Sequence, residues 1–447
     1  MKIIIGGAGA VGTHLAQLLS KEKHDIVLMD ENQERVLKLN ANFNLLTIVS
    51  PPSSIRAQKD AGVADADLFI GVTPDEATNM TCCMIASNLG CKKTVARIDN
   101  YEYLDPRNRE FFRYLGINAL VYPEMLAARE IANAVRTCWV RQWWEVGSGD
   151  LVMIGVKMRA TSHILNIPLK DLGGTELPYH VVAIKRGDET IIPNGLHHIM
   201  ENDLVYFMAN SKDLPEIQKV CGKEHYPDIK NILIVGGGRI AVRLALILPE
   251  HVHVTVVEND PKRCERLSDL LAGHSNITIV EGDGRNLGSL EEVQLKNYQA
   301  FVALTGNAET NILSCLSARK EGIGKTVAQV ENSEYVTMAQ DLDISTIINK
   351  KNIAAASIYQ KLLATDVNNL KSLELANADV AEFTVNADSR LTRKQVKDLG
   401  LPRGITIGGM VRDDVGMLVQ GSTQLQEGDH VVIFCLSGML QQLEKYL

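Results

Sequence analysis

The first residues whose types and spacing could do chemistry form a glycine-rich turn near the N-terminus. Six consecutive residues fit the pattern G-x-G-x-x-G: Gly7, Ala8, Gly9, Ala10, Val11 and Gly12. An isoleucine-rich run precedes them, and a helical pattern over residues 12–20 follows. In that context the first glycine permits a tight turn, the second lets a pyrophosphate approach the backbone, and the third lets helix and strand pack closely. The start of the helix would then offer N–H groups and partial positive charge to phosphates.

An acidic residue completes this signature. Asp30 ends an apolar run, residues 26–29, that we expect to be the second strand of the same sheet. A carboxylate there can accept hydrogen bonds from both hydroxyls of an adenosine ribose, and it would repel a 2′-phosphate. The pattern therefore favours NAD-type or plain adenine nucleotides over NADP. The alternative is a glycine-rich turn that only packs.

A second turn of the same kind lies in the other half of the chain. It comprises Gly236, Gly237, Gly238, Arg239 and Ile240, followed by alanine in place of the third glycine, which is a tolerated variant. Glu258 ends the run 254–257 and takes the position of the acid. Arg239 is new here. Its guanidinium can pair with a phosphate of its own ligand or of a neighbouring subunit, or it can be a solvated surface arginine.

The two turns have different surroundings. Residues 50–53 contain two prolines, whereas the aligned residues 281–284 read Glu-Gly-Asp-Gly. Arg97 aligns with Gln329. A cation at that edge of the sheet can reach a phosphate, whereas glutamine can only form hydrogen bonds. We therefore expect two sites with different ligand preferences.

These motifs recur because the chain repeats itself. Residues 3–12 resemble 232–241, residues 73–79 resemble 305–311, and residues 194–205 resemble 420–431. The chain therefore consists of two copies of a unit of roughly 225 residues.

Each copy has two parts. The first alternates strand and helix patterns, which predicts a parallel sheet with helices on both faces. The second has strand-like runs around a turn, at 151–158, 180–185 and 203–208, and again near 380–385, 405–411 and 429–434. The expected fold class is α/β, with two Rossmann-like doubly wound parallel sheets, each followed by a small α+β domain.

Composition and sequence pattern exclude several classes. The chain has 447 residues, of which 45% are apolar and 22% charged, as in ordinary globular proteins. A net charge of −8 without a basic run makes a nucleic-acid partner improbable. The eight cysteines show no zinc spacing, so we expect no metal site, and reduced, buried thiols in a cytosolic protein. The N-terminus reads as a strand rather than a signal peptide, and no 18-residue apolar run exists.

No catalytic machinery is visible beside the turns. A dehydrogenase needs a proton-handling group near the nicotinamide, and none of the histidines sits in a recognisable acid–base setting. A nucleophile elbow and a P-loop are also missing from the sequence. We therefore expect no catalytic residue and no enzymatic activity. Two nucleotide sites without chemistry indicate a sensor, and an NAD-dependent oxidoreductase is the alternative.

The residues quoted so far resemble the RCK (regulator of potassium conductance) domain. The resemblance rests on residues 1–16, Asp30, residues 65–80 and residues 96–103, and the second part of each copy resembles the RCK C-terminal domain. Two RCK units in one chain are similar to the tandem-RCK regulatory subunits of bacterial Trk-type potassium uptake systems, over essentially the whole length. The tandem arrangement is the specific part, because a single unit would fit several channel regulators equally well.

The resemblance implies ligands, partners and location. It implies NAD(H) and ATP or ADP in the N-terminal folds, and a homo-oligomeric, tetrameric ring that is peripheral on the inner, cytoplasmic face of the membrane. Nucleotide exchange in the ring would gate a membrane-embedded potassium-translocating subunit. A regulatory subunit for a different transporter or channel is the second alternative.

The resemblance also implies site residues and boundaries. The first site would comprise Gly7 to Val11, Asp30, Thr73, Pro74 and Arg97, and the second Gly236 to Ile240, Glu258, Asp283 and Thr305. The prolines at 51–52 depart from a glycine-containing turn usual in the family. The nucleotide-binding domains would span 1–122 and 229–348, the crossover helices with linkers 123–147 and 349–369, and the C-terminal domains 148–222 and 370–447.

Two further features have alternative interpretations. Related regulators use a glutamate at the start of the crossover helix for a divalent cation, and Glu124 holds that place here. The favoured interpretation is a first-turn acid stabilised by the helix dipole. All three tryptophans lie between 139 and 144 beside Arg141. They are either interface anchors or packing between the first nucleotide fold and its C-terminal domain.

Overall fold

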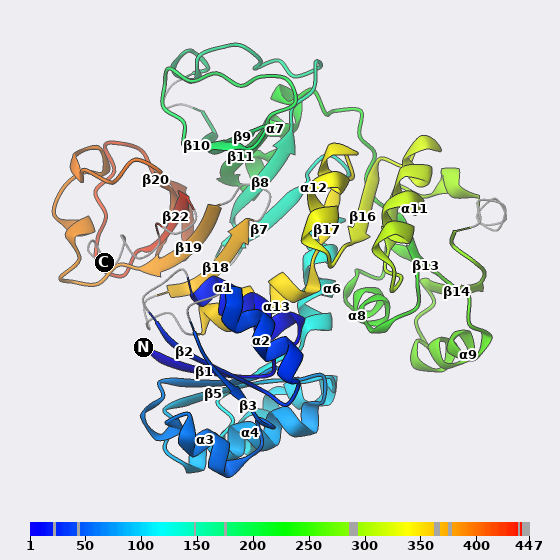
Figure 1. The fold of residues 1–447 in the computed structure, drawn as a ribbon. Coiled ribbons are helices and arrows are strands. Elements are labelled where there is room, and N and C mark those ends of the chain that lie inside the picture. The colour runs from blue at the N-terminus through cyan, green and yellow to red at the C-terminus, as the bar shows by residue number, and fades with distance from the viewer. Residues whose placement is uncertain are drawn as a thin grey trace. The chain divides into compact units, whose positions relative to one another are not determined.

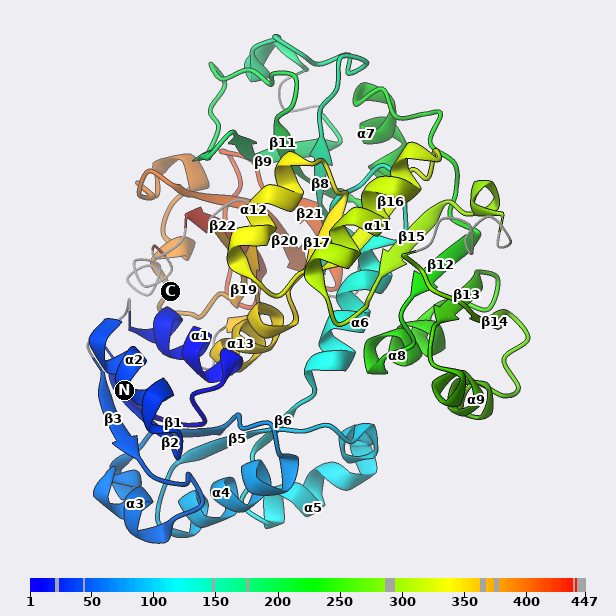
Figure 2. The same cartoon turned by 45° about the vertical axis from the view of Figure 1, so that its right-hand side comes forward.

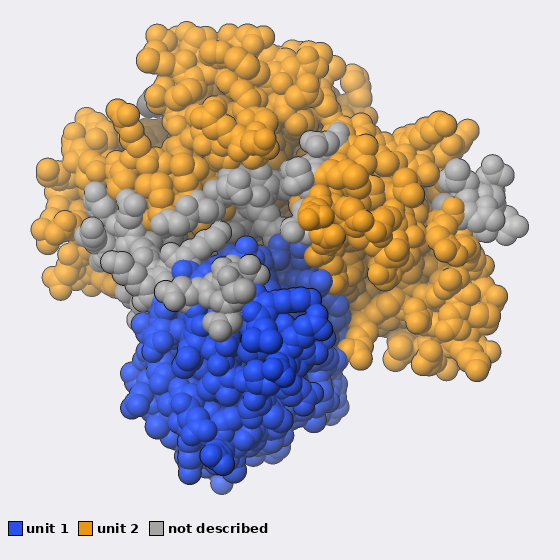
Figure 3. All heavy atoms as spheres, viewed as in Figure 1, with its two compact units in different colours: residues 1–127, 349–363 blue, residues 128–348, 364–447 orange. Residues whose placement is uncertain are grey.

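The computed structural model of the chain describes residues 1–20, 24–42, 45–146, 149–173, 177–285, 294–361, 367–373, 378–436 and 439 (Figure 1). Part of the expected second linker (362–366) and much of the end of the expected last domain (437–438 and 440–447) lie outside the described residues. The chain divides into two compact units (Figure 3). Unit 1 contains Met1–Ala127 and Asn349–Leu363, and unit 2 contains Ala128–Ile348 and Ala364–Leu447.

Unit 1 is built on a parallel sheet of six strands in the order β3-β2-β1-β4-β5-β6. Its strands are β1 (Lys2–Gly6), β2 (Asp25–Asp30), β3 (Leu46–Val49), β4 (Leu68–Gly71), β5 (Lys93–Arg97) and β6 (Ala119–Val121). Its helices are α1 (Ala10–Leu19), α2 (Gln33–Asn42), α3 (Ile55–Asp60), α4 (Glu76–Asn88), α5 (Arg109–Tyr114) and the start of α6 (Pro123–Ala134). The strand order reverses between β1 and β4, so the switch point of the sheet lies at the carboxyl ends of these two strands.

The central strand explains why helices cover both faces. Ile3, Ile4 and Ile5 in β1 are all fully buried. Because successive side chains of a strand point to opposite faces, Ile3 packs with Leu15 of α1, and Ile4 packs with Cys82 of α4. A strand that is apolar on both faces needs cover on both, and these helices supply it.

A helix from the second half of the chain completes unit 1. α13 (Lys350–Gln360) packs against α1, and its residues Ala354, Ala355 and Ile358 join the core there (Figure 1). The resemblance predicted a crossover helix at this point of the chain. Its packing partner inside the same chain is a finding of the structure.

The same helix supplies the partner of the Glu124 carboxylate. The Nζ atom of Lys350 lies 3.1 Å from Oε1 of Glu124, whose side chain is almost completely buried. The carboxylate therefore faces a lysine rather than further acids. Among the described residues, no group of three or more His, Cys, Asp or Glu side chains is placed to hold a metal ion.

Unit 2 contains the second parallel sheet, with strand order β14-β13-β12-β15-β16-β17 (Figure 2). Its strands are β12 (Asn231–Val235), β13 (His253–Glu258), β14 (Ile277–Glu281), β15 (Ala300–Ala303), β16 (Lys325–Gln329) and β17 (Thr346–Ile348). Its helices include α8 (Arg239–Ile247), α9 (Pro261–Leu270), α11 (Ala308–Lys320) and α12 (Ser333–Asp341). The order matches that of the first sheet, which confirms the repeat and the two Rossmann-like folds.

Two small antiparallel sheets make up the rest of unit 2, as the sequence predicts. The first, in the order β10-β9-β11-β8-β7, has β7 (Gln142–Val146), β8 (Leu151–Lys157), β9 (Tyr179–Arg186), β10 (Glu189–Ile191) and β11 (Leu204–Asn210), and α7 (Leu214–Val220) follows it. The second, in the order β18-β19-β22-β20-β21, has β18 (Val367–Leu373), β19 (Ala378–Thr384), β20 (Ile405–Arg412), β21 (Val415–Leu418) and β22 (His430–Leu436).

The two small sheets share a core. The rings of Tyr206 and Phe434 lie 5.9 Å apart, and both residues belong to one buried cluster. Gly408 of β20 faces Val182 so closely that an added Cβ would lie 2.6 Å from its side chain. Glycine at this position lets the two sheets approach closely.

The repeat extends to side-chain contacts in the small domains. Buried Asp203 accepts hydrogen bonds from Nε and Nη2 of Arg186, at 3.0 and 2.8 Å, just before the last strand of the first small sheet. Asp429 accepts the same two bonds from Arg412, at 2.7 and 2.6 Å. Each pair satisfies a buried carboxylate and holds the start of the last long strand against the end of an earlier strand, in the same way in both copies.

The tryptophans are core residues. Trp139 and Trp143 pack into the core of the first small sheet. Trp144 belongs to the cluster shared by the two small sheets. All three are at most 8% exposed, so they are core residues of the small domains rather than surface anchors.

The cysteines match their expected state. All eight are free, and seven are buried. Burial raises the pKa of Cys82 to about 12 and that of Cys138 to about 11, so these thiols remain protonated.

The described helices are short. The longest, α4 and α11, have 13 residues each, whereas a membrane span needs about 20. No described helix is long and apolar enough to cross a membrane.

Lys325 is a fully buried cation in unit 2. Its Nζ atom donates a hydrogen bond to the carbonyl of Val140 at 2.6 Å. Burial, and then the nearby charge of Arg141, lower the pKa of Lys325 to about 7, while Cys138 acts in the opposite direction. The lysine thus loses its proton far more readily in the folded chain than in the unfolded one.

This lysine predicts a pH dependence of stability. Between about pH 7 and pH 10 the unfolded chain binds more protons at this position than the folded chain, so its contribution to the free energy of unfolding rises with pH. We expect the urea midpoint of the unsubstituted protein, relative to Lys325→Met, to increase from pH 7 to pH 9. The exposed lysine variant Lys320→Met serves as control. A difference that is constant or shrinks over this window would contradict the prediction.

Candidate nucleotide-binding sites

The first glycine-rich turn joins β1 to α1 at the switch point of the first sheet. Gly7 has φ +121°, and a Cβ there would lie 2.9 Å from the backbone nitrogen of Thr73. A Cβ on Gly12 would lie 1.9 Å from the carbonyl oxygen of Gly7. Side chains are therefore excluded at both positions, by backbone conformation at Gly7 and by close packing at Gly12.

The middle glycine borders open space. A Cβ on Gly9 would meet nothing within 4 Å. Gly9 also begins α1, where no side chain caps the helix and no acid lies in the first turn. The first N–H groups, including those of Ala10 and Val11, have no acceptor within the helix. The turn can therefore accept an anionic ligand at a helix N-terminus.

The acid predicted from the sequence lies against this turn. Asp30 ends β2, is 7% exposed, and accepts hydrogen bonds from the backbone nitrogens of Ala8 at 2.6 Å and Asn32 at 2.8 Å. A carboxylate has about four acceptor positions, so about two remain. These can accept the two hydroxyls of a ribose.

Asn79 builds the other side of the first site. It is almost completely buried, and its Oδ1 accepts from N and Oγ1 of Thr73, at 2.7 and 2.8 Å. Its Nδ2 donates to the carbonyls of Thr73 and Arg97, both at 3.0 Å. One amide thus joins the loop after β4 to the end of β5.

Sequence reasoning gave Asn79 no role, although a signal was present. The spacing from Thr73 to Asn79 recurs from Thr305 to Asn311. Asn311 makes the same four contacts, to N, Oγ1 and O of Thr305 and to the carbonyl of Gln329, at 3.0, 2.6, 3.0 and 2.9 Å.

Arg97 lies at the carboxyl end of β5, on the same edge of the sheet. Its Nη2 is 3.4 Å from Asp99, and its side chain is 21% exposed. Its Nε is buried and has no hydrogen-bond partner among the described residues. Arg97 can therefore donate to a ligand. Pro74 is exposed and directly follows Thr73, to which Asn79 is hydrogen-bonded.

The prolines of the first site occupy two different environments. Pro51 is exposed, whereas Pro52 is buried at the end of β1, where a Cβ on Gly6 would lie 2.9 Å from it. Its carbonyl accepts from Nε2 of fully buried Gln58 at 2.8 Å. Pro52 thus helps to build the wall behind the turn.

The second glycine-rich turn repeats this backbone in unit 2. Gly236 has φ +101°, and a Cβ there would lie 2.8 Å from the carbonyl oxygen of Leu304. Gly238 is the N-cap residue of α8, as Gly9 is of α1, and both border open space. Ala241, in place of the third glycine, is fully buried. Arg239 and Ile240 form the first residues of α8, with Arg239 exposed.

The acid of the second site is more heavily engaged. Glu258 accepts from the backbone nitrogens of Gly237 at 2.7 Å, Asn259 at 2.9 Å and Asp260 at 3.0 Å. The Nη1 atom of Arg263 lies 3.4 Å from the same side chain. Less acceptor capacity remains than at Asp30, and a cation stands beside it. Sequence reasoning missed Arg263, which belongs to no motif.

The remaining residues of the second site also differ from the first. Asp283 accepts from Nε and Nη2 of Arg285, at 3.0 and 2.8 Å, and this contact lowers the pKa of Asp283. Gln329 donates to Glu331 at 3.1 Å, where the first site has the ion pair of Arg97. The second site thus loses the cation of Arg97 and has arginines in other places.

This architecture defines a class of protein: two Rossmann-like folds, each followed by a small antiparallel domain. The TrkA-N domain model matches residues 3–123 and 232–350, and the TrkA-C domain model matches residues 153–222 and 380–447. The chain is 30% identical to the Trk system potassium uptake protein TrkA of Halomonas elongata, over 98% of this chain and 96% of that protein. It is 29% identical to that of Vibrio alginolyticus, with the same coverage. The chain therefore belongs to the TrkA family.

Solved structures share the fold. The RCK domain of GsuK matches with a TM-score of 0.62 at 16% identity, covering all of this chain and 94% of that one. The GsuK channel bound to NAD matches with a TM-score of 0.60 at 16% identity, covering all of this chain and 78% of that one.

The buried asparagine supports a prediction. We expect Asn79→Ala to lower the stability of the first nucleotide fold by about 3 kcal/mol, because it leaves partly buried polar groups of Thr73 and Arg97 without the partner that Asn79 provides. The matched control is Asn88→Ala, an exposed position on the same helix, which should cost less than about 0.5 kcal/mol. Urea unfolding of each variant, monitored by the proteolytic cleavage of unit 1, measures both changes in stability. Equal effects would mean that the Asn79 contacts contribute little.

Proposed function

We propose that this chain is a non-enzymatic, nucleotide-sensing regulatory subunit of a potassium uptake system. The observation that carries the proposal is the pair of glycine-rich turns, each bonded to a carboxylate at a sheet switch point, in a chain that aligns with TrkA proteins over almost its whole length. Ligands of open parallel sheets bind at this point.

The proposed ligands are NAD(H) and ATP or ADP. In the first site the turn from Gly7 to Val11 would hold the phosphates, with Arg97 as a further donor, and Asp30 would hold the ribose. In the second site the turn from Gly236 to Ile240, Glu258, Asp283 and Thr305 would play the corresponding parts. The GsuK channel, which shares the fold, has been solved with NAD.

The two sites are proposed to prefer different nucleotides. Asp30 keeps free acceptor capacity for ribose hydroxyls, which suits NAD(H). The second site has arginines at 239, 263 and 285, and its acid is already engaged. Arginine pairs well with phosphates, so the second site suits the charged tail of ATP or ADP.

The residues proposed for the two sites support regulation without catalysis. None of the residues proposed for either site is a histidine, lysine or cysteine, so the usual proton donors of hydride chemistry are missing from the set. A ligand that binds two states of the protein unequally shifts their populations. We propose that this shift, in a homo-oligomeric ring on the cytoplasmic face of the membrane, gates a membrane-embedded potassium-translocating partner.

Two acid variants test the sites one at a time. We expect Asp30→Ala to weaken NADH binding about tenfold or more, and Glu258→Ala to weaken ATP binding similarly, because each removes charged hydrogen-bond acceptors. Glu110→Gln, an exposed carboxylate on α5, is the control. Calorimetry of the full chain measures the affinities. Unchanged affinity for both nucleotides in both variants would refute the assigned sites.

The regulatory role has its own test. Purified chain supplied with NAD(H) and a panel of hydroxy, keto and aldehyde substrates should show no turnover. Expressed in cells that lack their own potassium uptake regulators, it should copurify with a Trk-type membrane subunit and restore potassium uptake. Steady oxidation or reduction of the nicotinamide would favour the oxidoreductase alternative instead. Copurification with an unrelated channel would identify a different transport partner.

A further inference from the structure

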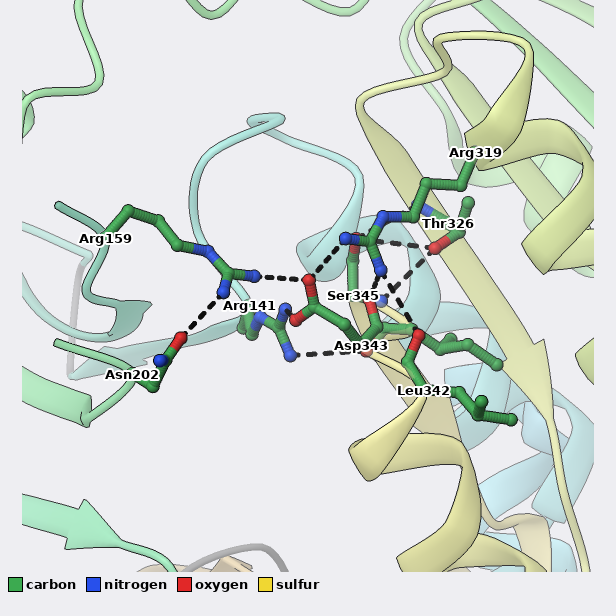
Figure 4. A network of polar contacts seen from close by, with 9 residues as sticks. Arg141, Arg159, Asn202, Arg319, Thr326, Leu342, Asp343 and Ser345 are labelled. Carbon is green, nitrogen blue, oxygen red and sulfur yellow. Dashed lines mark hydrogen bonds and ion pairs between the residues drawn. The ribbon is translucent and has the colours of Figure 1, made fainter. Parts of the chain in front are cut away.

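Three arginines converge on one carboxylate in unit 2, away from both glycine-rich turns in the sequence. Figure 4 shows Arg141, Arg159 and Arg319 around Asp343. Arg141 contacts Oδ1, while Arg159 and Arg319 both contact Oδ2, the latter at 2.5 Å. Arg141 precedes the first small sheet, Arg159 follows β8, and Arg319 lies on α11. The cluster thus joins the first small domain to the second nucleotide fold.

Asp343 occupies a backbone position where glycine is usual. It has φ +62° just after α12, and the backbone nitrogen of Ile344 bonds to the carbonyl of Ala339 at 3.2 Å. Such helix ends favour glycine because the left-handed conformation is strained for other residues. Aspartate adopts this conformation more readily than most residues other than glycine, and here its carboxylate reaches the three arginines.

The first copy of the repeat shows the position without the charge. The same bond joins Ile117 to Phe112 at 2.9 Å, and the left-handed residue there is Gly116. A Cβ on Gly116 would meet Ser87 of α4, which aligns with Arg319 of α11. Glycine and serine in one copy thus correspond to aspartate and arginine in the other.

The small domains differ in the same way. The backbone bond from Met158 to Asp203 recurs from Val385 to Asp429, both at 2.8 Å. This register aligns Lys157 and Arg159 with Thr384 and Asn386. Lys157 and Arg159, which come from the first small domain, therefore have no charged counterparts at the aligned positions of the second.

Among the described residues, Asp343 is the carboxylate that pairs with all three arginines, and one negative charge does not balance three positive ones. Burial lowers the pKa of Lys157 and of Lys223, and the positive charges of Arg141 and Arg159 lower both further. With the described residues, the three guanidiniums in Figure 4 also contact backbone carbonyls and Asn202, and these contacts use fewer than half of their fifteen N–H donors. The neighbouring carboxylate of Asp203 is already bonded to Arg186.

We propose that the Arg141–Arg159–Arg319 cluster is a binding site for a compact multivalent oxyanion, such as a short phosphate chain. Planar guanidiniums match phosphate oxygens in pairs, and a multivalent anion balances charge that a single aspartate leaves. The side chains are 14%, 34% and 44% exposed, so an ion can enter while remaining partly shielded from water. Bound there, the anion adjusts how firmly the first small domain is held to the second nucleotide fold.

The test is calorimetric titration of the full chain with inorganic pyrophosphate, in the presence of saturating NADH. Arg159→Gln should weaken pyrophosphate binding about tenfold or more, because it removes a charged donor. Asp343→Asn should strengthen it about tenfold, because it removes the competing negative charge while asparagine still accepts the left-handed backbone. Arg107→Gln, in an exposed pair with Asp105, should change nothing.

The outcomes separate the alternatives. If Arg159→Gln binds pyrophosphate as tightly as the unsubstituted chain, or if Asp343→Asn binds it no better, the cluster is only a clamp between domains and the proposal is wrong. If ATP displaces pyrophosphate from the unsubstituted chain, the ligand is a nucleotide tail; if it does not, the ligand is a free phosphate chain. Failure of NADH and ATP to bind at the turns would refute the proposed function without affecting this titration.

Discussion

The close approach of two loops at the end of the first strand is the constraint on which both nucleotide folds depend. Gly7 and Gly236 adopt left-handed backbone conformations, and an added Cβ at either would lie within 3 Å of the loop that follows the neighbouring strand. That approach aims the start of the next helix at the sheet edge, where parallel strands of reversed order leave room for a ligand. The carboxylates of Asp30 and Glu258 then bond to the turn itself, so turn and acid are held as one piece.

Duplication preserved this frame and changed what surrounds it. Asn79 and Asn311 make the same four hydrogen bonds, and Asp203 and Asp429 hold the same strand ends together. Charges, by contrast, were redistributed. Arginine sits at the edge of the first site, whereas the second has its arginines in the turn and beside its acid. Buried contacts tolerate little change, because unsatisfied polar groups are costly, while half-exposed charges can vary.

Much of the architecture could be predicted from local patterns. Apolar runs, the glycine spacing and the internal repeat indicated two parallel sheets and two small antiparallel ones, and the structure confirms them. The strands β6, β10 and β17, of three residues each, were not predicted, because so short a segment has no readable periodicity. Asn79 was also overlooked as a site residue, since its importance lies in contacts with residues on two other segments.

The sequence by itself determined the repeat, the two glycine-rich turns and the acids that follow them, because each of these depends on residues close together in the chain. Only the tertiary structure decided that α13 packs on the first fold, that the tryptophans are core residues, and that Asp343 meets three arginines. These depend on segments separated by up to a few hundred residues. Neither composition nor residue spacing specifies such tertiary contacts, because they arise from how the packed elements are arranged.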